Sequence, residues 1–354
     1  MRQLARDCYH FFRLSAFGAT AVLPLLGAAS TDPGLCGRRV AGLLGVAAAF
    51  HAFAYVHNDL CDLAVDRTQP LRAAYPLVRG AVAPQIALAV ALACVPTAFA
   101  VSTWAAADHP RSTAHRHLAA AFGLMAAYNY WGKRCPFPPL TDLVQGLGWA
   151  ALLRYGAAAT GFPPTRLTGL LASYEVLLIL LVNSVHGGLR DLGNDLATGA
   201  RTTPIMFGAN EWADGSLAVP PAFLTYALLL QAALLALPLW GALANVAGHP
   251  TQGRQRALVG VGAITVLLLA LPGAATRGAT QPAEVGMFHL MLILTPPLAL
   301  VAPAMAPAPR AALLLAHTLP LLANGMTYAA LRWALGIFQK RRVHPDSLGR
   351  YGGA

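Results

Sequence analysis

Long apolar runs separated by short polar breaks fill this chain from about residue 14 to about residue 338. Each run approaches the roughly 20 apolar residues that an α-helix needs to cross a bilayer. The alternating segments of about ten residues that mark a transmembrane β-barrel are not found in the sequence, so no strands are expected. The pattern predicts an all-α polytopic membrane protein with nine or ten transmembrane helices, at about 14–29, 40–58, 84–106, 116–131, 140–160, 167–187, 221–246, 257–273, 284–306 and 311–338.

Composition agrees with a membrane protein. Of the 354 residues, 56% are hydrophobic and 11% are charged, whereas soluble domains carry about 25% charged residues. The net charge of +11 comes from Lys and Arg scattered through the polar breaks, with no basic stripe between aromatic residues, so we expect no nucleic-acid partner. The cysteines are isolated from one another, which predicts no disulfide framework and no zinc motif. They are Cys8, Cys36, Cys61, Cys94 and Cys135.

Polar side chains with a regular spacing stand out at the end of the second and sixth runs. Asn58, Asp62 and Asp66 are four residues apart and so share one face of a helix. Asp191 and Asp195 repeat this spacing at the end of the sixth run. Carboxylates at a membrane segment are costly unless they face a polar cavity, pair or bind a cation, and they therefore indicate function. The two acidic segments predict one shared cation cluster.

These side chains supply hard oxygen ligands, the kind that suits Mg²⁺. Mg²⁺ usually completes its octahedral shell with water and substrate phosphates, so a diphosphate substrate is implied. Basic side chains on the same face could hold the other phosphate oxygens. Together they would stabilise the charge that builds on a diphosphate leaving group. The candidates are Arg72, Lys133, Arg134, Arg190 and Arg201.

The distribution of Lys and Arg predicts an orientation. If the N-terminus is cytoplasmic, every even-numbered run ends inside, together with both acidic segments, the Lys133–Arg134 pair and the basic tail at 339–354. More Lys and Arg then lie inside than outside, as the positive-inside rule requires. The richness in Ala, Gly and Pro favours a bacterial source. We therefore expect a multi-pass protein of the bacterial inner membrane with its site facing the cytoplasm.

The two acidic segments also suggest an internal repeat. Each follows an even-numbered run and precedes a loop rich in Arg, Pro and Gly. Repeats that place a site at their interface are common in membrane proteins. We expect a single transmembrane domain over residues 1–338, with half-repeats at about 14–134 and 140–306.

The spacing within both segments fits a known family pattern. Residues 58–66 are NDLCDLAVD, which matches N-x-x-x-D-x-x-x-D. Residues 190–208 are RDLGNDLATGARTTPIMFG, which matches D-x-x-x-D followed by a Gly, a basic residue and T-x-P, here Gly199, Arg201, Thr202 and Pro204. In these motifs, and in their position after the second and sixth runs, the chain resembles the UbiA superfamily of intramembrane prenyltransferases. The resemblance covers most of the chain up to about residue 300.

The resemblance implies a helical bundle around a central cavity that opens laterally to lipid and is capped by two long cytoplasmic loops. In the family, the acidic motifs bind an isoprenyl diphosphate through Mg²⁺, the diphosphate ionises to an allylic carbocation, and an acceptor, often an aromatic ring, attacks it. By position, the first-motif role falls to Asn58, Asp62 and Asp66, the second-motif role to Asp191 and Asp195, and the diphosphate-binding Tyr-Lys pattern to Tyr128 and Lys133.

The chain departs from the family pattern at two places. Gly193 stands where many members have Glu between the second-motif aspartates. Tyr75-Pro76-Leu77 stands where many have Arg-Pro-Leu, with Arg72 displaced upstream. These departures leave the acceptor open.

Three interpretations follow. The first is Mg²⁺-dependent transfer of an isoprenyl group from a polyprenyl diphosphate to a small, aromatic or quinone-like acceptor within the membrane. The second is a terpene cyclase of the same superfamily, in which the substrate's own double bond quenches the carbocation, and Gly193 slightly favours it. The third is a non-catalytic lipid-binding or transport protein, against which the five intact ligands argue. All three make the lipid bilayer a partner, and the sequence indicates no oligomeric state.

Three further polar residues have secondary roles in this interpretation. Asp59 lies off the face of the first motif and is expected to cap or support it. Asn183 and His186, late in the sixth run, are candidates to line the cavity and touch the acceptor.

Overall fold

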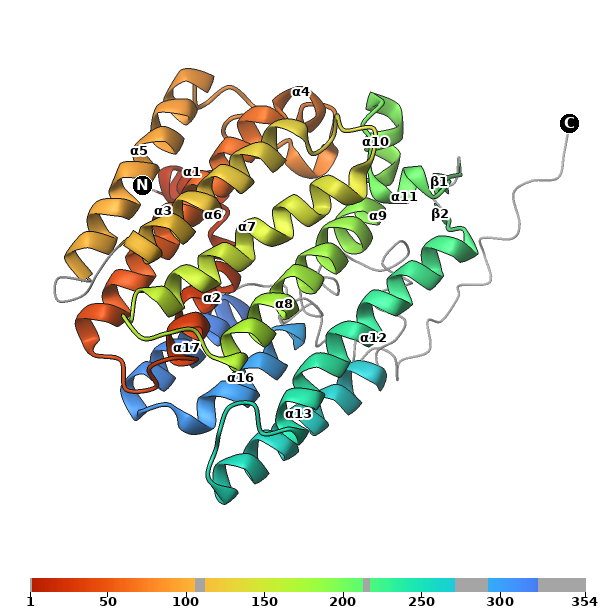
Figure 1. The fold of residues 1–354 in the computed structure, drawn as a ribbon. Helices are drawn as coiled ribbons and strands as arrows, with labels where there is room; N and C mark the ends of the chain where they lie inside the picture. Colours follow the sequence, from red (N-terminus) through yellow and green to blue (C-terminus); the bar gives the residue numbers. More distant parts are fainter. Residues whose placement is uncertain (1, 106–111, 213–216, 271–291, 324–354) are drawn as a thin grey trace, which may run out of the picture.

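The computed structural model describes residues 2–105, 112–212, 217–270 and 292–323 (Figure 1). Within these ranges the chain is a bundle of long helices joined by short loops. The first half contains α1 (Arg2–Phe11), η1 (Leu14–Ala16), α2 (Phe17–Ala29), α3 (Gly37–Cys61), α4 (Leu63–Asp66), η2 (Pro70–Arg72), α5 (Pro84–Ala105) and α6 (Ser112–Trp131).

The second half begins with α7 (Pro138–Ala158) and α8 (Arg166–Leu180), which continues through the π-helix η3 (Leu181–Gly187) into α9 (Gly188–Arg190). The short helices α10 (Leu192–Thr198) and α11 (Thr203–Met206) follow. The last described helices are α12 (Pro221–Leu243), α13 (Thr251–Ala270), α16 (Thr295–Val301), η4 (Ala302–Ala304) and α17 (Pro307–Ala323).

Local sequence signals set several helix starts. Pro138 occupies the first turn of α7, where a missing backbone N–H costs nothing and the fixed φ favours the helix. Thr165 caps α8, because its hydroxyl accepts from the backbone N–H of Thr168 while the Thr168 hydroxyl accepts from the backbone N–H of Thr165. The first eight predicted runs, from 14–29 to 257–273, are helical where the structure describes them, with ends close to those predicted. Of the last two runs, the structure describes the helices Thr295–Val301 and Pro307–Ala323.

The predicted number of spans is not confirmed. In the part of the chain that the structure describes, four helices are long and apolar enough to cross a bilayer, namely Gly37–Cys61, Pro84–Ala105, Arg166–Arg190 and Pro221–Leu243. A bent pair, Gln3–Phe11 with Leu14–Ala29, raises the number to five. α6 and α7 have the length of a span but carry polar side chains such as Asn129 and Asp142. Parts of the runs at 257–273, 284–306 and 311–338, and the tail at 339–354, lie outside the described residues.

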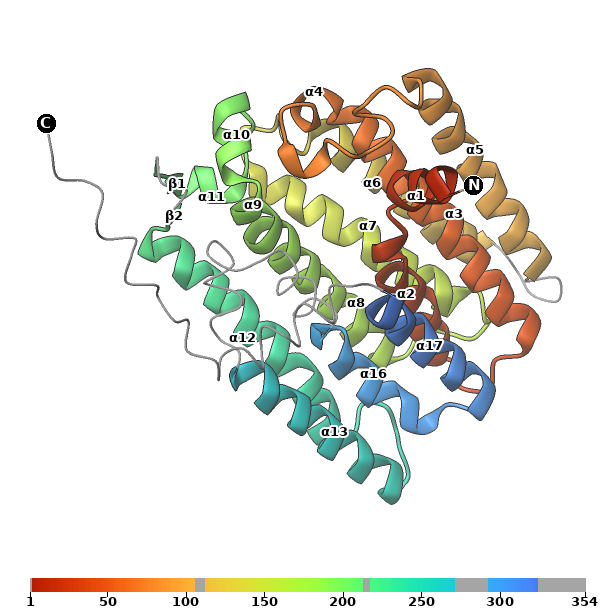
Figure 2. The same cartoon turned by 180° about the vertical axis from the view of Figure 1, so that it is seen from behind.

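Small residues let the central helices approach closely. A Cβ atom on Gly27 of α2 would overlap the backbone of Leu153 in α7, and one on Gly156 of α7 would overlap Pro24 in α2. Such contacts are typical of helix pairs in membranes. The hydrophobic effect does not drive helix association there, and close packing between the backbones stabilises the pair instead. α7 thus lies in the middle of the bundle, beside α2, α6 and α8 (Figures 1 and 2).

The expectation of no strands is wrong. β1 (Asn210–Glu211) and β2 (Leu217–Ala218) form an antiparallel pair, with Asn210 opposite Ala218 and Glu211 opposite Leu217. The pair lies in the polar segment between α11 and α12, outside the apolar runs. A segment without helical hydrogen bonds can satisfy its backbone groups by such pairing, and the apolar pattern gives no sign of it.

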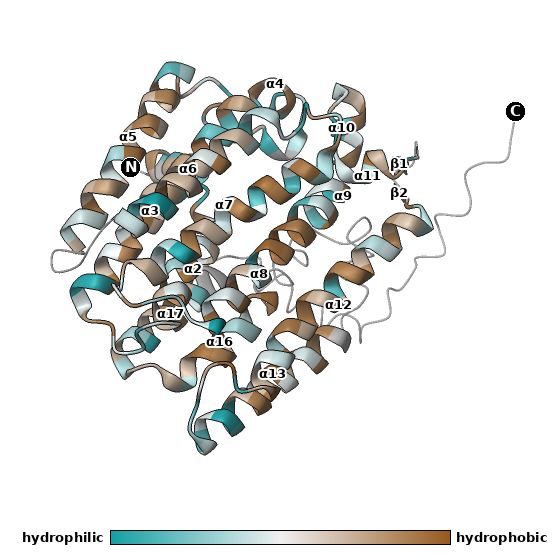
Figure 3. Cartoon of the chain, viewed as in Figure 1, coloured by the Kyte–Doolittle hydropathy of each residue, from teal (hydrophilic) through white to brown (hydrophobic). Residues whose placement is uncertain are grey.

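The polar ends of the two acidic segments lie at the same end of the bundle. α4 follows α3, and α10 follows α9, and both short helices lie at the top of the bundle (Figure 1). Hydrophobic positions run along α8 and α12, whereas hydrophilic positions are frequent in the loop beside α4 (Figure 3). The fold therefore brings the two acidic segments to one polar end.

Candidate active site

Each acidic segment contains a helix break at its first aspartate. Asp62 separates α3 from α4 with φ −96° and ψ 6°, and Asp191 separates α9 from α10 with φ −98° and ψ 5°. These values lie in the sparsely populated bridge region in which many active-site residues are found. The backbone bonds from Asp62 N–H to Asn58 O (2.9 Å) and from Asp66 N–H to Asp62 O (2.8 Å) remain. The four-residue spacing is thus kept, but on a kinked helix rather than a continuous one.

The first motif holds carboxylates with few partners. Asn58 Nδ2 donates to Asp62 Oδ2 at 3.2 Å. Asp66 is 5% exposed, and its Oδ2 has no hydrogen-bond partner among the described residues. Burial raises the pKa of Asp62 to about 6, and burial also raises the pKa of Asp66. A buried carboxylate oxygen without a donor fits a divalent cation, which would favour the ionised form.

The second motif holds carboxylates that are already paired. Arg190 donates from Nε (3.0 Å) and Nη2 (2.6 Å) to the two oxygens of Asp191. Lys133 Nζ donates to Asp195 Oδ1 at 2.9 Å, and Asp195 is 1% exposed. Burial alone would raise the pKa of Asp191, but the bidentate arginine outweighs it and holds this pKa below its usual range. Each carboxylate of the second motif therefore has a cation beside it.

Lys133 connects the two motifs electrostatically. Burial would lower its pKa, but the charges of Asp195 and Asp62 raise the pKa of Lys133 above its ordinary value. Asp191 acts on it in the same direction. The Lys133 ammonium thus contacts the second motif directly and interacts with the charge of the first.

Neutral side chains of the loop after α4 and of α10 tie the motifs together. Thr68 Oγ1 donates to Asn194 Oδ1 at 2.9 Å, and Asn194 Nδ2 donates to the backbone oxygen of Val65 at 3.2 Å. Gln69 Nε2 donates to Asp191 Oδ1 at 3.3 Å. Thr68, Gln69 and Asn194 could not be predicted from the sequence, because isolated uncharged residues form no periodic pattern.

The donor set fits Mg²⁺ only together with a substrate. No group of three or more His, Cys, Asp or Glu side chains converges on a single ion position within the ranges that the structure describes. Mg²⁺ is usually held by one or two carboxylates plus substrate phosphates rather than by an all-protein cage. The carboxylates of the two motifs would therefore hold Mg²⁺ together with the phosphate oxygens of a diphosphate substrate.

The other predicted basic residues differ in position. Arg72 lies 4.8 Å above the ring of Tyr75, and its charge acts on Asp66. Arg134 donates to the backbone oxygens of Tyr130 (2.9 Å) and Cys61 (3.4 Å), beside the end of α3 and not on the acidic side chains.

Arg201 contacts the site residues through its backbone. Its N–H donates to the oxygen of Lys133 at 2.9 Å, and its side chain is exposed. This bond ties the loop after the second motif to the lysine that pairs with Asp195. Tyr128 donates its hydroxyl to Asn183 Oδ1 at 2.9 Å.

Arg13 is a further charged residue of the site that the sequence did not indicate. It forms an ion pair with Asp59 and lies 5.1 Å from the ring centroid of Tyr55 and 5.7 Å from that of Tyr75. Its backbone adopts a left-handed conformation with φ 43°, which is uncommon for a residue other than glycine. Its charge acts on Asp62. In the sequence, Arg13 looks like an ordinary interfacial arginine, because its partner is 46 residues away.

Another carboxylate lies against Gly193, where many family members have a glutamate. A Cβ atom built on Gly193 would overlap the carboxylate of Glu211, which comes from β1. The departure at Gly193 therefore coincides with a close approach of Glu211 to α10.

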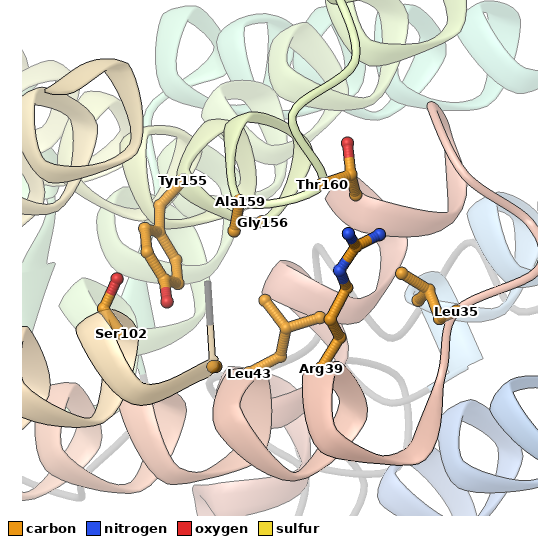
Figure 4. A pocket seen from close by; sticks show the side chains of 9 residues that line it. Leu35, Arg39, Leu43, Ser102, Tyr155, Gly156, Ala159 and Thr160 are labelled. Atoms are coloured by element: carbon orange, nitrogen blue, oxygen red, sulfur yellow. The ribbon is translucent and has the colours of Figure 1, made fainter. Parts of the chain in front are cut away.

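The described pockets lie away from the acidic motifs. One is lined by Arg39, Ser102, Tyr155 and neighbouring residues (Figure 4). Arg39 and Asp62 are 23 positions apart on α3, which corresponds to about 34 Å along the helix, so this pocket lies at the opposite end of the bundle. A second, apolar cleft of ≈ 620 Å³ lies between α8 and α12 and is lined by residues such as Val176, Leu237 and Trp240.

Comparisons with known proteins give a consistent result. The sequence model of the UbiA prenyltransferase family matches residues 16–257. A structure described as digeranylgeranylglyceryl phosphate synthase has 16% identity and a TM-score of 0.56, covering 86% of this chain and 99% of that one. An apo UbiA homologue from Aeropyrum pernix K1 has 18% identity and a TM-score of 0.54, covering 81% and 96%. A UbiA homologue from Archaeoglobus fulgidus bound to GPP and Mg²⁺ has 15% identity and a TM-score of 0.56, covering 81% and 98%. No curated protein sequence matches the chain.

Proposed function

The chain belongs to the UbiA prenyltransferase family, and from this premise we propose that it transfers an isoprenyl group from a polyprenyl diphosphate to a small, aromatic or quinone-like acceptor. The observation that carries the proposal is the position of Lys133, which pairs with Asp195 at 2.9 Å and also interacts with Asp62. Two acidic motifs and one ammonium that interacts with both would provide for the cations and the phosphates of a metal diphosphate. The likeness to a homologue bound to GPP and Mg²⁺ supports the same substrate class.

Each charged residue has a role in this proposal. Asn58, Asp62 and Asp66 of the first motif would hold Mg²⁺ together with Asp191 and Asp195 of the second. When bound, Mg²⁺ would neutralise the charge that builds on the diphosphate as the bond between carbon and oxygen breaks.

Basic residues hold the leaving group. Lys133 binds phosphate oxygens, assisted by the set Arg72, Arg134, Arg190 and Arg201, and by Tyr128 in the pattern that the family resemblance implies. The diphosphate leaves with the electron pair of the broken bond, and the allylic carbocation is attacked by the acceptor, which then loses a proton. The reaction takes place within the membrane, and we place the motifs on the cytoplasmic side of a bacterial inner membrane.

The test uses purified full-length protein in detergent with Mg²⁺ and a panel of C10 to C20 allylic diphosphates. Diphosphate release is measured without acceptor and with phenolic or quinone-like acceptors, and organic products are identified by mass spectrometry. The proposal expects prenylated acceptor and little release in its absence. A cyclic hydrocarbon or terpene alcohol formed without acceptor, at the rate of diphosphate release, would identify a terpene cyclase instead. No turnover under any condition would support a non-catalytic protein.

A matched control separates chemistry from folding. Asp62→Asn and Asp191→Asn each remove one ligand charge while keeping the side-chain shape, and both should reduce diphosphate release by about 100-fold or more. Asp32→Asn changes an aspartate that pairs with Arg39 and accepts from the backbone N–H of Gly34, at the other end of α3. It should keep wild-type turnover.

A further inference from the structure

Four polar side chains from four elements form a hydrogen-bonded chain beside the acidic motifs. Tyr128 of α6 donates its hydroxyl to Asn183 Oδ1 at 2.9 Å. Asn183, in the π-helix η3, donates from Nδ2 to Asp142 Oδ1 of α7. Thr203 of α11 donates its hydroxyl to Asp142 Oδ2. Asp142 is 5% exposed and Thr203 is 1% exposed, so water does not reach these two residues freely.

Asp142 sets the direction of the hydrogen bonds among these four side chains. An ionised carboxylate can only accept hydrogen bonds. Asn183 must therefore turn its amide NH₂ toward Asp142, which leaves its amide oxygen facing Tyr128. An amide oxygen can only accept, so the Tyr128 hydroxyl must donate its single hydrogen to Asn183. The orientation of an amide is normally ambiguous in a structure, but the acidic end of this chain fixes it.

The hydrogen bond to Asn183 limits the interactions that the Tyr128 hydroxyl can make with a substrate. With its hydrogen committed to Asn183, the hydroxyl retains only its lone pairs, which accept hydrogen bonds or face positive charge. Asp62 and Asp195, one from each motif, both interact with Tyr128 electrostatically, so the ring lies near the diphosphate site. Phosphate oxygens are acceptors themselves, and they gain nothing from another acceptor.

We propose that Asp142 is a positioning residue that acts through Asn183 to fix Tyr128 as a hydrogen-bond acceptor facing the site. The oxygen and ring face of Tyr128 then lie toward the allylic carbon, where positive charge develops, rather than toward the diphosphate. An electron-rich ring face and an oxygen lone pair stabilise a nearby cation. This assignment rests on the proposed function for the nature of the cation, and it revises the diphosphate-binding role that the family resemblance implies for Tyr128.

The helix geometry supports a dedicated role for Asn183. η3 is a π-helical stretch of seven residues inside an otherwise α-helical segment. Such wide turns are rare and occur frequently at functional sites. Here the wide turn carries the one side chain that contacts both α6 and α7 in the described network.

The first experiment reads the hydrogen bond without any turnover. The tyrosine Raman doublet distinguishes a hydroxyl that donates from one that accepts, and the difference between wild type and Tyr128→Phe isolates the signal of Tyr128 from those of the other tyrosines. We expect a strong donor signature. In Asp142→Asn the new amide can donate, Asn183 can turn around, and the donor signature should be lost. A Tyr128 signal that is not of the donor type in the wild type would overturn the proposal.

Thr203→Val is the matched control for this spectrum. It removes the other hydrogen bond of Asp142 but leaves a carboxylate facing Asn183, so the donor signature should persist. Loss of the donor signature in both Thr203→Val and Asp142→Asn would indicate that either change loosens the packing. It would overturn the proposal that the charge of Asp142 sets the direction of the Tyr128 hydrogen bond.

The second experiment separates the two roles of Tyr128 by kinetics. If Tyr128 stabilises the cation, Tyr128→Phe should lower kcat by about tenfold, because the oxygen is lost, and should change KM for the prenyl diphosphate little. Asp142→Asn should lower kcat to a similar extent, and the double variant should be no worse than either single one. A raised KM with an unchanged kcat in Tyr128→Phe would make Tyr128 a phosphate ligand and overturn the proposal.

The two experiments separate the inference from the proposed function. If the wild type releases no diphosphate, the proposed function fails, while the Raman spectrum still decides whether Asp142 fixes the hydrogen bond of Tyr128. If the wild type turns over but the donor signature is missing, the inference fails and the proposed function stands.

Discussion

The two acidic motifs share a backbone geometry but differ in their electrostatic partners. Asp62 and Asp191 break their helices with nearly the same φ and ψ. Arg190 and Lys133 compensate the second motif, whereas the Oδ2 atom of Asp66 in the first motif is buried and has no partner among the described residues. A repeated sequence motif therefore need not give two equivalent sites. Under the proposed function, the first motif would receive a metal cation directly, whereas a metal at the second motif would have to replace a side-chain cation beside its carboxylates.

The largest expected effect is a loss of activity that the two motifs share, whereas their effects on stability should differ. Asp66→Asn and Asp195→Asn should each reduce diphosphate release by about 100-fold or more, since each removes a ligand charge. Their stabilities without Mg²⁺ should differ. Asp66→Asn removes an unpartnered buried charge and should not lower the thermal midpoint. Asp195→Asn leaves Lys133 without its ion pair and should cost about 1–3 kcal/mol.

Thermal unfolding of the two variants in the same detergent, with and without Mg²⁺, checks this difference. Equal losses of stability would mean that the two motifs are electrostatically equivalent, against the comparison. Lys133→Arg serves as the matched control, because it keeps the charge beside Asp195 and should retain most of the stability.

A smaller effect is expected from Arg190. Its guanidinium binds Asp191 through two nitrogens, so Arg190→Gln frees that carboxylate and also removes a candidate phosphate ligand. We expect KM for the prenyl diphosphate to rise by about tenfold, with a smaller change in kcat, measured by initial rates at saturating Mg²⁺. A lower KM would show that the ion pair competes with the substrate instead of binding it.

The pH dependence of Mg²⁺ activation should reflect the raised pKa values of the carboxyl groups in the first motif. Burial raises the pKa of Asp62 to about 6 and raises the pKa of Asp66. Below these pKa values the carboxyl groups are protonated, and Mg²⁺ must displace the proton to bind. The Mg²⁺ concentration for half-maximal rate should therefore increase by about tenfold from about pH 7.5 to about pH 5.5, and saturating Mg²⁺ should restore the rate. A constant requirement for Mg²⁺ over this range would contradict the raised pKa values.

The smallest effect is expected at Gly193. A methyl group there would overlap the carboxylate of Glu211, which is the far end of a flexible, exposed side chain and can move aside. Alanine is the better helix former by about 0.5–1 kcal/mol. Gly193→Ala should therefore be neutral or slightly stabilising in thermal unfolding. A clear loss of stability would show that Glu211 is held against α10 and belongs to the second motif.

Much of the fold could be predicted because the signals are local. The apolar runs predict the helices, and Pro138 and Thr165 mark two of their starts. The four-residue spacing of Asp62 and Asp66 persists because each backbone bond joins residues four apart. The breaks at Asp62 and Asp191 could not be predicted, since a four-residue spacing fits both a straight and a kinked helix.

The sequence by itself determined the membrane class, the helical elements, the two acidic motifs and the family resemblance, because composition, periodicity and spacing are properties of neighbouring residues. Only the tertiary structure decided which charges are compensated. The partners of Lys133 and Arg13 lie 62 and 46 positions away, and the carboxylate beside Gly193 comes from a strand that no apolar pattern predicts. Helix packing selects these partners from many residues of the same type, so no local pattern can identify them.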